Sequence, residues 1–135
     1  MGEEKRRKAA GVTIPSFPEP WIDQQLAQYP QSGSPGISYF RGDLPSGLWV
    51  DCLVYRDNNG KARAVLNHFP VDTPPWEQRG NILILVAQEW RRRGIGTALL
   101  KEALTRWDIP LERQKSTKDG ARFVKRYLQR KTVEA

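Results

Sequence analysis

The clearest alternation of apolar and polar positions lies between residues 48 and 69. Residues 48–55 follow the two-residue period of a half-buried strand, and residues 62–69 form a second such run. The turn between them contains Asn59-Gly60, a pair that favours a two-residue type I′ hairpin loop. That loop would set a register with three facing pairs: Val54 with Val65, Leu53 with Leu66, and Asp51 with His68.

The apolar pattern changes in the second half of the chain. Residues 82–86 are apolar without interruption, which is typical of a strand at the centre of a sheet. Beyond Gly94 the apolar positions follow the helical period until Pro110, which disfavours helix in the residue before it. Two more elements are predicted after this helix: a short strand at 109–113, and a helix capped by Ser116 or Thr117 that runs to Leu128.

The N-terminal part is the least regular. Residues 1–36 contain five prolines and a Ser/Gly-rich stretch, a composition typical of tails and linkers. We expect a flexible tail over 1–36, with a short helix at 20–29 that begins at Pro20 and docks on the core. Residues 37–135 would form one compact domain, which opens with a short strand at 37–40. This element order predicts an α+β or α/β fold with a mixed sheet.

Composition excludes several classes of protein. The chain has 135 residues, of which 39% are hydrophobic and 27% charged, as expected for one globular domain. Its longest apolar run, Ile82 to Ala87, is too short to span a bilayer as a helix, and its charged first residues predict no secretory signal. Cys52 is the only cysteine and His68 the only histidine, so neither a disulfide nor a zinc site is expected. We expect a cytoplasmic protein with no membrane partner.

The formal net charge of +7 comes entirely from the C-terminal third. Residues 1–88 carry nine basic and nine acidic side chains, whereas residues 89–135 carry thirteen basic and six acidic ones. This asymmetry indicates an anionic partner, either a nucleic acid or a phosphorylated small molecule. A solvated face without a partner is the alternative.

The junction between the strand at 82–86 and the following helix combines three arginines, 91–93, with two glycines. A helix N-terminus presents unpaired N–H groups and a partial positive charge, which together bind phosphate. Gly94 and Gly96 would let a phosphate approach the backbone, and Thr97 can add a hydroxyl. The segment lacks the P-loop lysine and the third glycine of the dinucleotide fingerprint. A tight turn beside a solvated charged run is the alternative.

Arg91-x-x-Gly94-x-Gly96, preceded by an apolar strand and followed by Leu99-Leu100, resembles the acetyl-CoA-binding signature of the GNAT family of N-acetyltransferases. The hairpin before this motif and the segment 120–124 after it are similar to the family's order of elements. The resemblance covers roughly residues 37–128. It implies a mixed, mostly antiparallel sheet flanked by helices, here truncated at both ends.

The resemblance also implies an acetyl-CoA-dependent N-acetyltransferase that acts on an amine of a small molecule or protein. Loop and first-turn N–H groups would hold the pyrophosphate of acetyl-CoA, and the end of the strand would bind its pantetheine arm. The basic surface at 113–131 would meet the 3′-phosphate. The cofactor-binding candidates are Leu85, Val86, Arg91, Arg92, Arg93, Gly94, Ile95, Gly96 and Thr97.

Three residues are candidates for proton transfer. Histidine titrates near neutral pH, so His68, with Asp51 opposite it in the hairpin, is the predicted base. A half-exposed surface histidine is the alternative. Glu77 is the rival base, because it lies three residues before the position of a strand glutamate in related enzymes. Tyr127 is the candidate acid for the CoA thiolate, and a core position is its alternative.

The chain departs from the family's pattern in two places. Residues 41–47 leave no room for two helices that the family usually has there, and seven residues follow Leu128, where it usually has a final hairpin. A sheet edge left open in this way predicts a homodimer. Two other functions stay open: a catalytically inactive CoA-binding relative, and a nucleic-acid-binding protein using 91–93 and 113–131. The second is disfavoured because exposed aromatic residues are sparse there.

Overall fold

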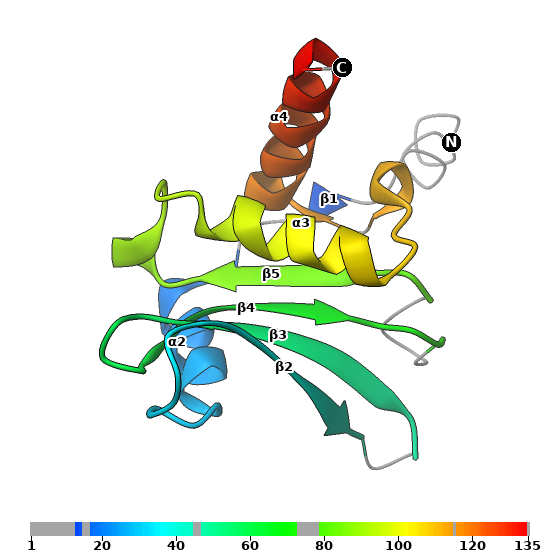
Figure 1. Ribbon diagram of the computed structural model, residues 1–135. Helices are drawn as coiled ribbons and strands as arrows, with labels where there is room; N and C mark the ends of the chain where they lie inside the picture. Colours follow the sequence, from blue (N-terminus) through cyan, green and yellow to red (C-terminus); the bar gives the residue numbers. More distant parts are fainter. Residues whose placement is uncertain (1–12, 15–16, 45–46, 73–78, 115, 135) are drawn as a thin grey trace. The chain divides into compact units, whose positions relative to one another are not determined.

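Figure 1 shows the computed structural model of the chain, which describes residues 13–14, 17–44, 47–72, 79–114 and 116–134. The chain divides into two compact units. The larger unit spans Pro18–Ile109, and the smaller unit is made of the segments on either side of it. The predicted division into a tail at 1–36 and a domain at 37–135 stays a prediction.

A four-stranded antiparallel sheet forms the centre of the larger unit (Figure 1). Each strand pairs with its neighbour in the sequence, so the order in the sheet is the order in the chain. The strands are β2 (Gly36–Asp43), β3 (Trp49–Arg56), β4 (Ala62–His68) and β5 (Ile82–Val86). This arrangement, with helices on the sheet, confirms the predicted α+β fold with an antiparallel sheet flanked by helices.

The β3–β4 hairpin has the register that its sequence pattern predicts. Val54 pairs with Val65, Leu53 with Leu66, and Asp51 with His68. The preceding strand, β2, is longer than the predicted 37–40, because every residue from Gly36 to Asp43 pairs with β3. Residues 41–43 therefore belong to the sheet, and the connection from β2 to β3 is short.

The turn of this hairpin differs from the predicted type I′. Gly60 has a φ of 82°, whereas Asn59 is not among the residues with positive φ, and type I′ needs both. Asp57 Oδ1 accepts the backbone N–H of Asn59 and of Lys61 at 2.9 and 3.0 Å, a side-chain turn that competes with the left-handed conformation at Asn59. The result is a three-residue loop, with a bulge one step into the strands.

Asp57 gives this turn a pH-dependent stability. Its Oδ2 accepts a hydrogen bond from Arg63 Nε at 2.7 Å, and this bond, opposed by burial, holds the pKa of Asp57 below its usual range. A lowered pKa in the folded state adds stability above the ordinary carboxyl pKa of about 4, and that stability is lost as pH falls further. We expect Asp57→Asn to lower the Tm at pH 7, and the deficit to shrink as pH falls from about 4 to 2.

Thermal unfolding followed by circular dichroism measures this effect. Asp43→Asn is the matched control, because Asp43 forms an exposed ion pair with Arg41 whose side chains are 79% and 54% exposed. Such pairs contribute little. A Tm deficit of Asp57→Asn that stays constant from pH 7 to pH 2 would contradict the assignment.

The strand β5 lies at the edge of the sheet, so its predicted central position is wrong. Within the described residues, β4 is its one partner strand. The strand is apolar on both faces because α2 and α3 both contact it. An edge strand between two helical layers therefore has the sequence of a central strand. The predicted homodimer was inferred from an open sheet edge, and it stays a prediction.

Two helices cover opposite faces of the sheet (Figure 1). Helix α2 (Glu19–Ala27), which confirms the helix predicted at 20–29, buries Ile22 and Leu26. Helix α3 (Ile95–Arg106) lies on the other face, as the apolar period after Gly94 predicts. The core between these layers contains, among others, Leu53, Val54, Val65, Leu66, Leu85, Leu99, Leu100 and Ala103.

The smaller unit contains β1 (Thr13–Ile14), which pairs in parallel with β6 (Ser116–Thr117), and α4 (Lys118–Glu134). Helix α4 continues past its predicted end at Leu128. The strand predicted at 109–113 is wrong, because Leu111–Arg113 forms a 3₁₀ turn in which Arg113 N donates to Pro110 O. Pro110 lacks the N–H that a strand ladder needs. None of the helices in the described part of the chain is both long and apolar enough to span a membrane.

Candidate functional site

The candidate site begins where β5 ends. After Val86 the chain makes a 3₁₀ turn at Gln88–Trp90, and α3 begins at Ile95. Between these elements two residues adopt left-handed backbone conformations, Arg92 with a φ of 63° and Gly94 with a φ of 80°. This conformation is strained for a residue that has a side chain. Contacts around the loop must therefore stabilise the backbone conformation of Arg92.

Gly94 leaves open space at the start of α3. A Cβ built on this glycine would meet no atom within 4 Å. The first backbone bond of the helix runs from Ala98 N to Gly94 O at 3.0 Å. Ile95, Gly96 and Thr97 come before Ala98 in the first turn, so their N–H groups have no acceptor within the helix. The positive end of the helix dipole therefore borders an uncrowded position, which is suited to an anion.

The three arginines of the loop have three different environments. Arg91 points back into the structure, where Nε donates to Val86 O at 3.1 Å and the guanidinium forms an ion pair with Glu19 of α2 at 2.7 Å. Arg93 lies 4.5 Å over the ring of Trp90. Arg92 is exposed. Of the three arginines, Arg92 and Arg93 have exposed side chains and form no ion pair among the described residues.

The outer edge of β5 offers backbone groups to a ligand. Ala87 N donates to Arg63 O, so the backbone of Ala87 faces β4. In an antiparallel pair every second residue faces the neighbouring strand in this way, and the residues between them face outward. Leu85 therefore directs its backbone groups to β4, while Ile84 and Val86 direct theirs to the outer edge, which no other described strand covers. Of the two strand residues predicted to bind the pantetheine arm, Val86 has the suitable orientation and Leu85 does not. Ile84 was missed, and the alternation of the ladder would have identified it.

A buried polar cluster lies at the opposite end of the sheet, on the face that α3 covers. His68 is only 5% exposed, and its Nδ1 lies 2.9 Å from Asp51 Oδ2. Tyr39 donates its hydroxyl to Asp51 Oδ1 at 2.7 Å, and this bond to the carboxylate raises the pKa of Tyr39. Trp107 stacks on His68 with ring centroids 4.6 Å apart and an interplanar angle of 10°. The half-exposed alternative for His68 is therefore wrong, and the Asp51 contact expected from the register is present.

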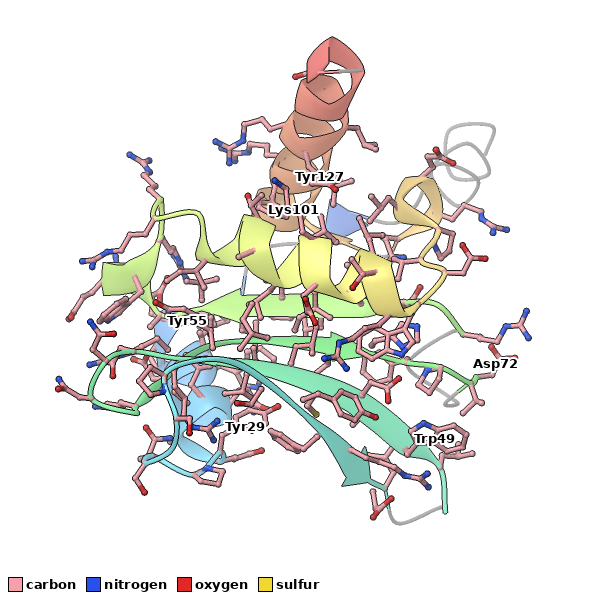
Figure 2. The ribbon with its side chains drawn as sticks, in the orientation of Figure 1. Tyr29, Trp49, Tyr55, Asp72, Lys101 and Tyr127 are labelled. Atoms are coloured by element: carbon pink, nitrogen blue, oxygen red, sulfur yellow. The ribbon has the colours of Figure 1, made fainter. Side chains whose placement is uncertain are left out.

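A second polar contact lies on the α2 face of the sheet. Tyr29 donates its hydroxyl to Asn67 Oδ1 at 3.3 Å, and burial raises the pKa of Tyr29 and of the nearby Cys52 thiol. Both groups are consequently neutral at physiological pH. Figure 2 labels Tyr29 on this side of the sheet, away from α3. The contact is part of the core and not part of the loop.

The remaining two candidates lie outside the described part of the larger unit. Glu77 lies outside the described residues. Tyr127 lies on α4 of the smaller unit and is half-buried. Among the described residues no group of three or more potential metal ligands is present. Sequence analysis missed Glu19, Tyr39 and Trp107, because each acts through a partner that is distant in the sequence.

Comparison with known proteins identifies one family. The model of the acetyltransferase (GNAT) family matches residues 12–108, which include β2 to β5, the loop and α3. No curated protein and no solved structure matches the chain. The match covers more than half of the chain and contains the motif on which the resemblance was based.

Proposed function

The chain belongs to the GNAT acetyltransferase family, and on this premise we propose that it transfers an acetyl group from acetyl-CoA to an amine. The acceptor would be an amine of a small molecule or of a protein. The observation that carries the proposal is Gly94, where a positive φ and open space occur at the start of α3, the helix that follows the edge strand β5 and its loop.

The residues of the loop fit a pyrophosphate. The first-turn N–H groups of Ile95, Gly96 and Thr97 would hold it, and the open space at Gly94 would admit it. Arg92 and Arg93 would supply the charge, because Arg91 is already paired with Glu19. The N–H of Val86 and the backbone groups of Ile84 would bind the pantetheine amides along the outer edge of β5, so the thioester would lie toward the Ile82 end of the strand, where His68 pairs.

Acetyl-CoA supplies the acetyl group already activated as a thioester. The amine must lose a proton before it attacks, and we propose His68 as the proton acceptor. With Nδ1 bonded to the Asp51 carboxylate, Nε2 is the nitrogen left to accept a proton. His68 pairs with Ile82, four residues before Val86, so it lies about 13 Å along the strand from the loop. Glu77 remains the alternative base and Tyr127 the proposed acid.

Calorimetric titration with acetyl-CoA tests the binding part of the proposal. We expect saturable binding of acetyl-CoA, and only weak binding of a nucleic-acid oligonucleotide that disappears between about 50 and 200 mM salt. Tight oligonucleotide binding together with no acetyl-CoA binding would favour the nucleic-acid alternative.

Release of the free thiol of CoA, measured with a panel of primary amines, then tests catalysis. Binding of acetyl-CoA with no thiol release for any amine in the panel would favour the inactive relative. Direct attack within a ternary complex predicts that thiol release depends on both substrates, because much of the rate comes from holding them together.

A further inference from the structure

An acidic residue lies beside the proposed phosphate loop. Glu19, the first residue of α2, places its Oε1 2.7 Å from the Arg91 guanidinium. A carboxylate near an anion site repels the anion, so its presence there calls for another role. Its second oxygen, Oε2, is shielded from solvent and has no hydrogen-bond partner among the described residues. An unsatisfied buried oxygen is costly, so stability alone does not account for this carboxylate.

Arg91 joins three parts of the structure. Its guanidinium contacts Glu19 at the start of α2, its Nε donates to the last carbonyl of β5 at Val86, and its backbone leads into the strained residue Arg92. The two side-chain contacts hold opposite parts of one planar group, which fixes its orientation. The direction of the chain into the loop is therefore set by α2 and by β5 together.

Comparison with a second ion pair shows how the Glu19–Arg91 pair differs from an ordinary surface pair. Glu102 and Arg106 form a pair at 3.0 Å, with side-chain exposures of 39% and 40%, similar to the 36% of both Glu19 and Arg91. The Glu102–Arg106 pair, however, lies within one helix, and the contact that Arg106 makes outside it, 5.3 Å over the Tyr39 ring of β2, does not involve the loop. The Glu19–Arg91 pair connects a helix to a loop whose sequence is more than seventy residues away.

We propose that Glu19 is a positioning residue, which holds the loop at 91–97 in its phosphate-binding form through Arg91. This inference rests on the proposed function for its ligand, the pyrophosphate of acetyl-CoA. Glu19 itself touches no substrate. It also neutralises Arg91, so the charge available to a phosphate comes from the rest of the loop.

Two substitutions separate position from charge. Glu19→Gln removes the charge but keeps an oxygen that accepts a hydrogen bond from Arg91, whereas Glu19→Ala removes both. If Glu19 positions the loop, Glu19→Ala weakens acetyl-CoA binding at least tenfold, and Glu19→Gln binds within about threefold of the wild type. In steady state the Ala variant raises KM for acetyl-CoA and leaves kcat within about threefold. Glu102→Ala, the matched control, changes neither the affinity nor KM.

Hydrogen exchange of the ligand-free full chain gives a reading that does not depend on acetyl-CoA. We expect the amides at 92–97 to exchange at least tenfold faster in Glu19→Ala than in the wild type, with Glu19→Gln and Glu102→Ala unchanged. Failure of the wild type to bind acetyl-CoA would refute the proposed function, and the exchange result would still decide the role of Glu19.

Three results would overturn the inference. Unchanged loop exchange in Glu19→Ala is the first. Equal affinity of the Ala variant and the wild type is the second. The third is tighter binding by both the Ala and Gln variants, because that would mean that Glu19 only repels the ligand. If the Ala variant does not fold, Glu19→Ser takes its place, because serine is well tolerated at the start of a helix and is too short to reach Arg91, and wild-type exchange at 92–97 in that variant overturns the inference.

Discussion

Gly94→Glu is expected to abolish acetyl-CoA binding while the fold is retained. The new carboxylate would lie at the start of α3, where it satisfies the first-turn N–H groups in place of a phosphate and repels the pyrophosphate. The left-handed conformation, with a φ of 80°, costs a non-glycine residue about 1–2 kcal/mol. An acid at a helix N-terminus recovers part of this cost. We expect affinity to fall at least about 100-fold, which is about 2.8 kcal/mol, by calorimetry.

Gly47→Glu is the matched control for this variant. Gly47 has a φ of 82°, and a Cβ there also meets no atom within 4 Å, so the backbone cost is the same. Gly47 precedes β3, at the end of the sheet where Figure 2 shows Trp49. The loop is at the opposite end, where Tyr55 lies, because Tyr55 pairs with Ala64 and Ala64 pairs with Val86. The control should lose similar stability and keep wild-type affinity. Wild-type affinity in Gly94→Glu, with a native circular dichroism spectrum, would refute the pyrophosphate site.

His68→Ala is expected to lower kcat/KM by about 100-fold to 10,000-fold, which is the usual contribution of a general base. The Ala variant also leaves the buried Asp51 without its His68 partner, which costs about 1–3 kcal/mol of stability.

His68→Asn separates the catalytic effect from the structural one. The asparagine amide can donate to Asp51 from nearly the position of Nδ1, so it should recover most of the lost Tm. It cannot act as a base, so kcat/KM should stay as low as in His68→Ala. If His68→Asn keeps wild-type kcat/KM from pH 6 to 9, His68 is a structural residue, and profiles of Glu77→Gln and Tyr127→Phe then test the remaining candidates.

The parts of the fold that follow from local pattern could be predicted from the sequence. The register of β3 with β4 follows from the two-residue period, because a shift by one residue would turn Leu53 and Leu66 to the wrong face. The start of α3 follows from Gly94 and the change of period after it. The loop and its motif were identified for the same reason: the residues that define them are adjacent in the chain.

Features that depend on contacts between distant segments could not be predicted. The edge position of β5 could not be recognised, because helices cover both faces of this strand. A strand covered on both faces has the same apolar sequence as a central strand. The burial of His68 depends on Trp107, which reaches it from the end of α3. A glutamate at the start of a helix is explained by the helix dipole alone, so no sequence signal distinguishes Glu19 from other residues of this kind.

The meander of β2 to β5 has a consequence for the order of folding. Each strand pairs with its neighbour in the sequence, so the sheet can form through short loop closures, which are the fast ones. The contact between Glu19 and Arg91 closes a far longer stretch of chain and needs both α2 and the end of β5 in place. We therefore expect the sheet and α3 to assemble first, and the loop at 91–97 to take its final shape only after α2 has docked. A refolding chain would thus form its sheet before its candidate site is complete.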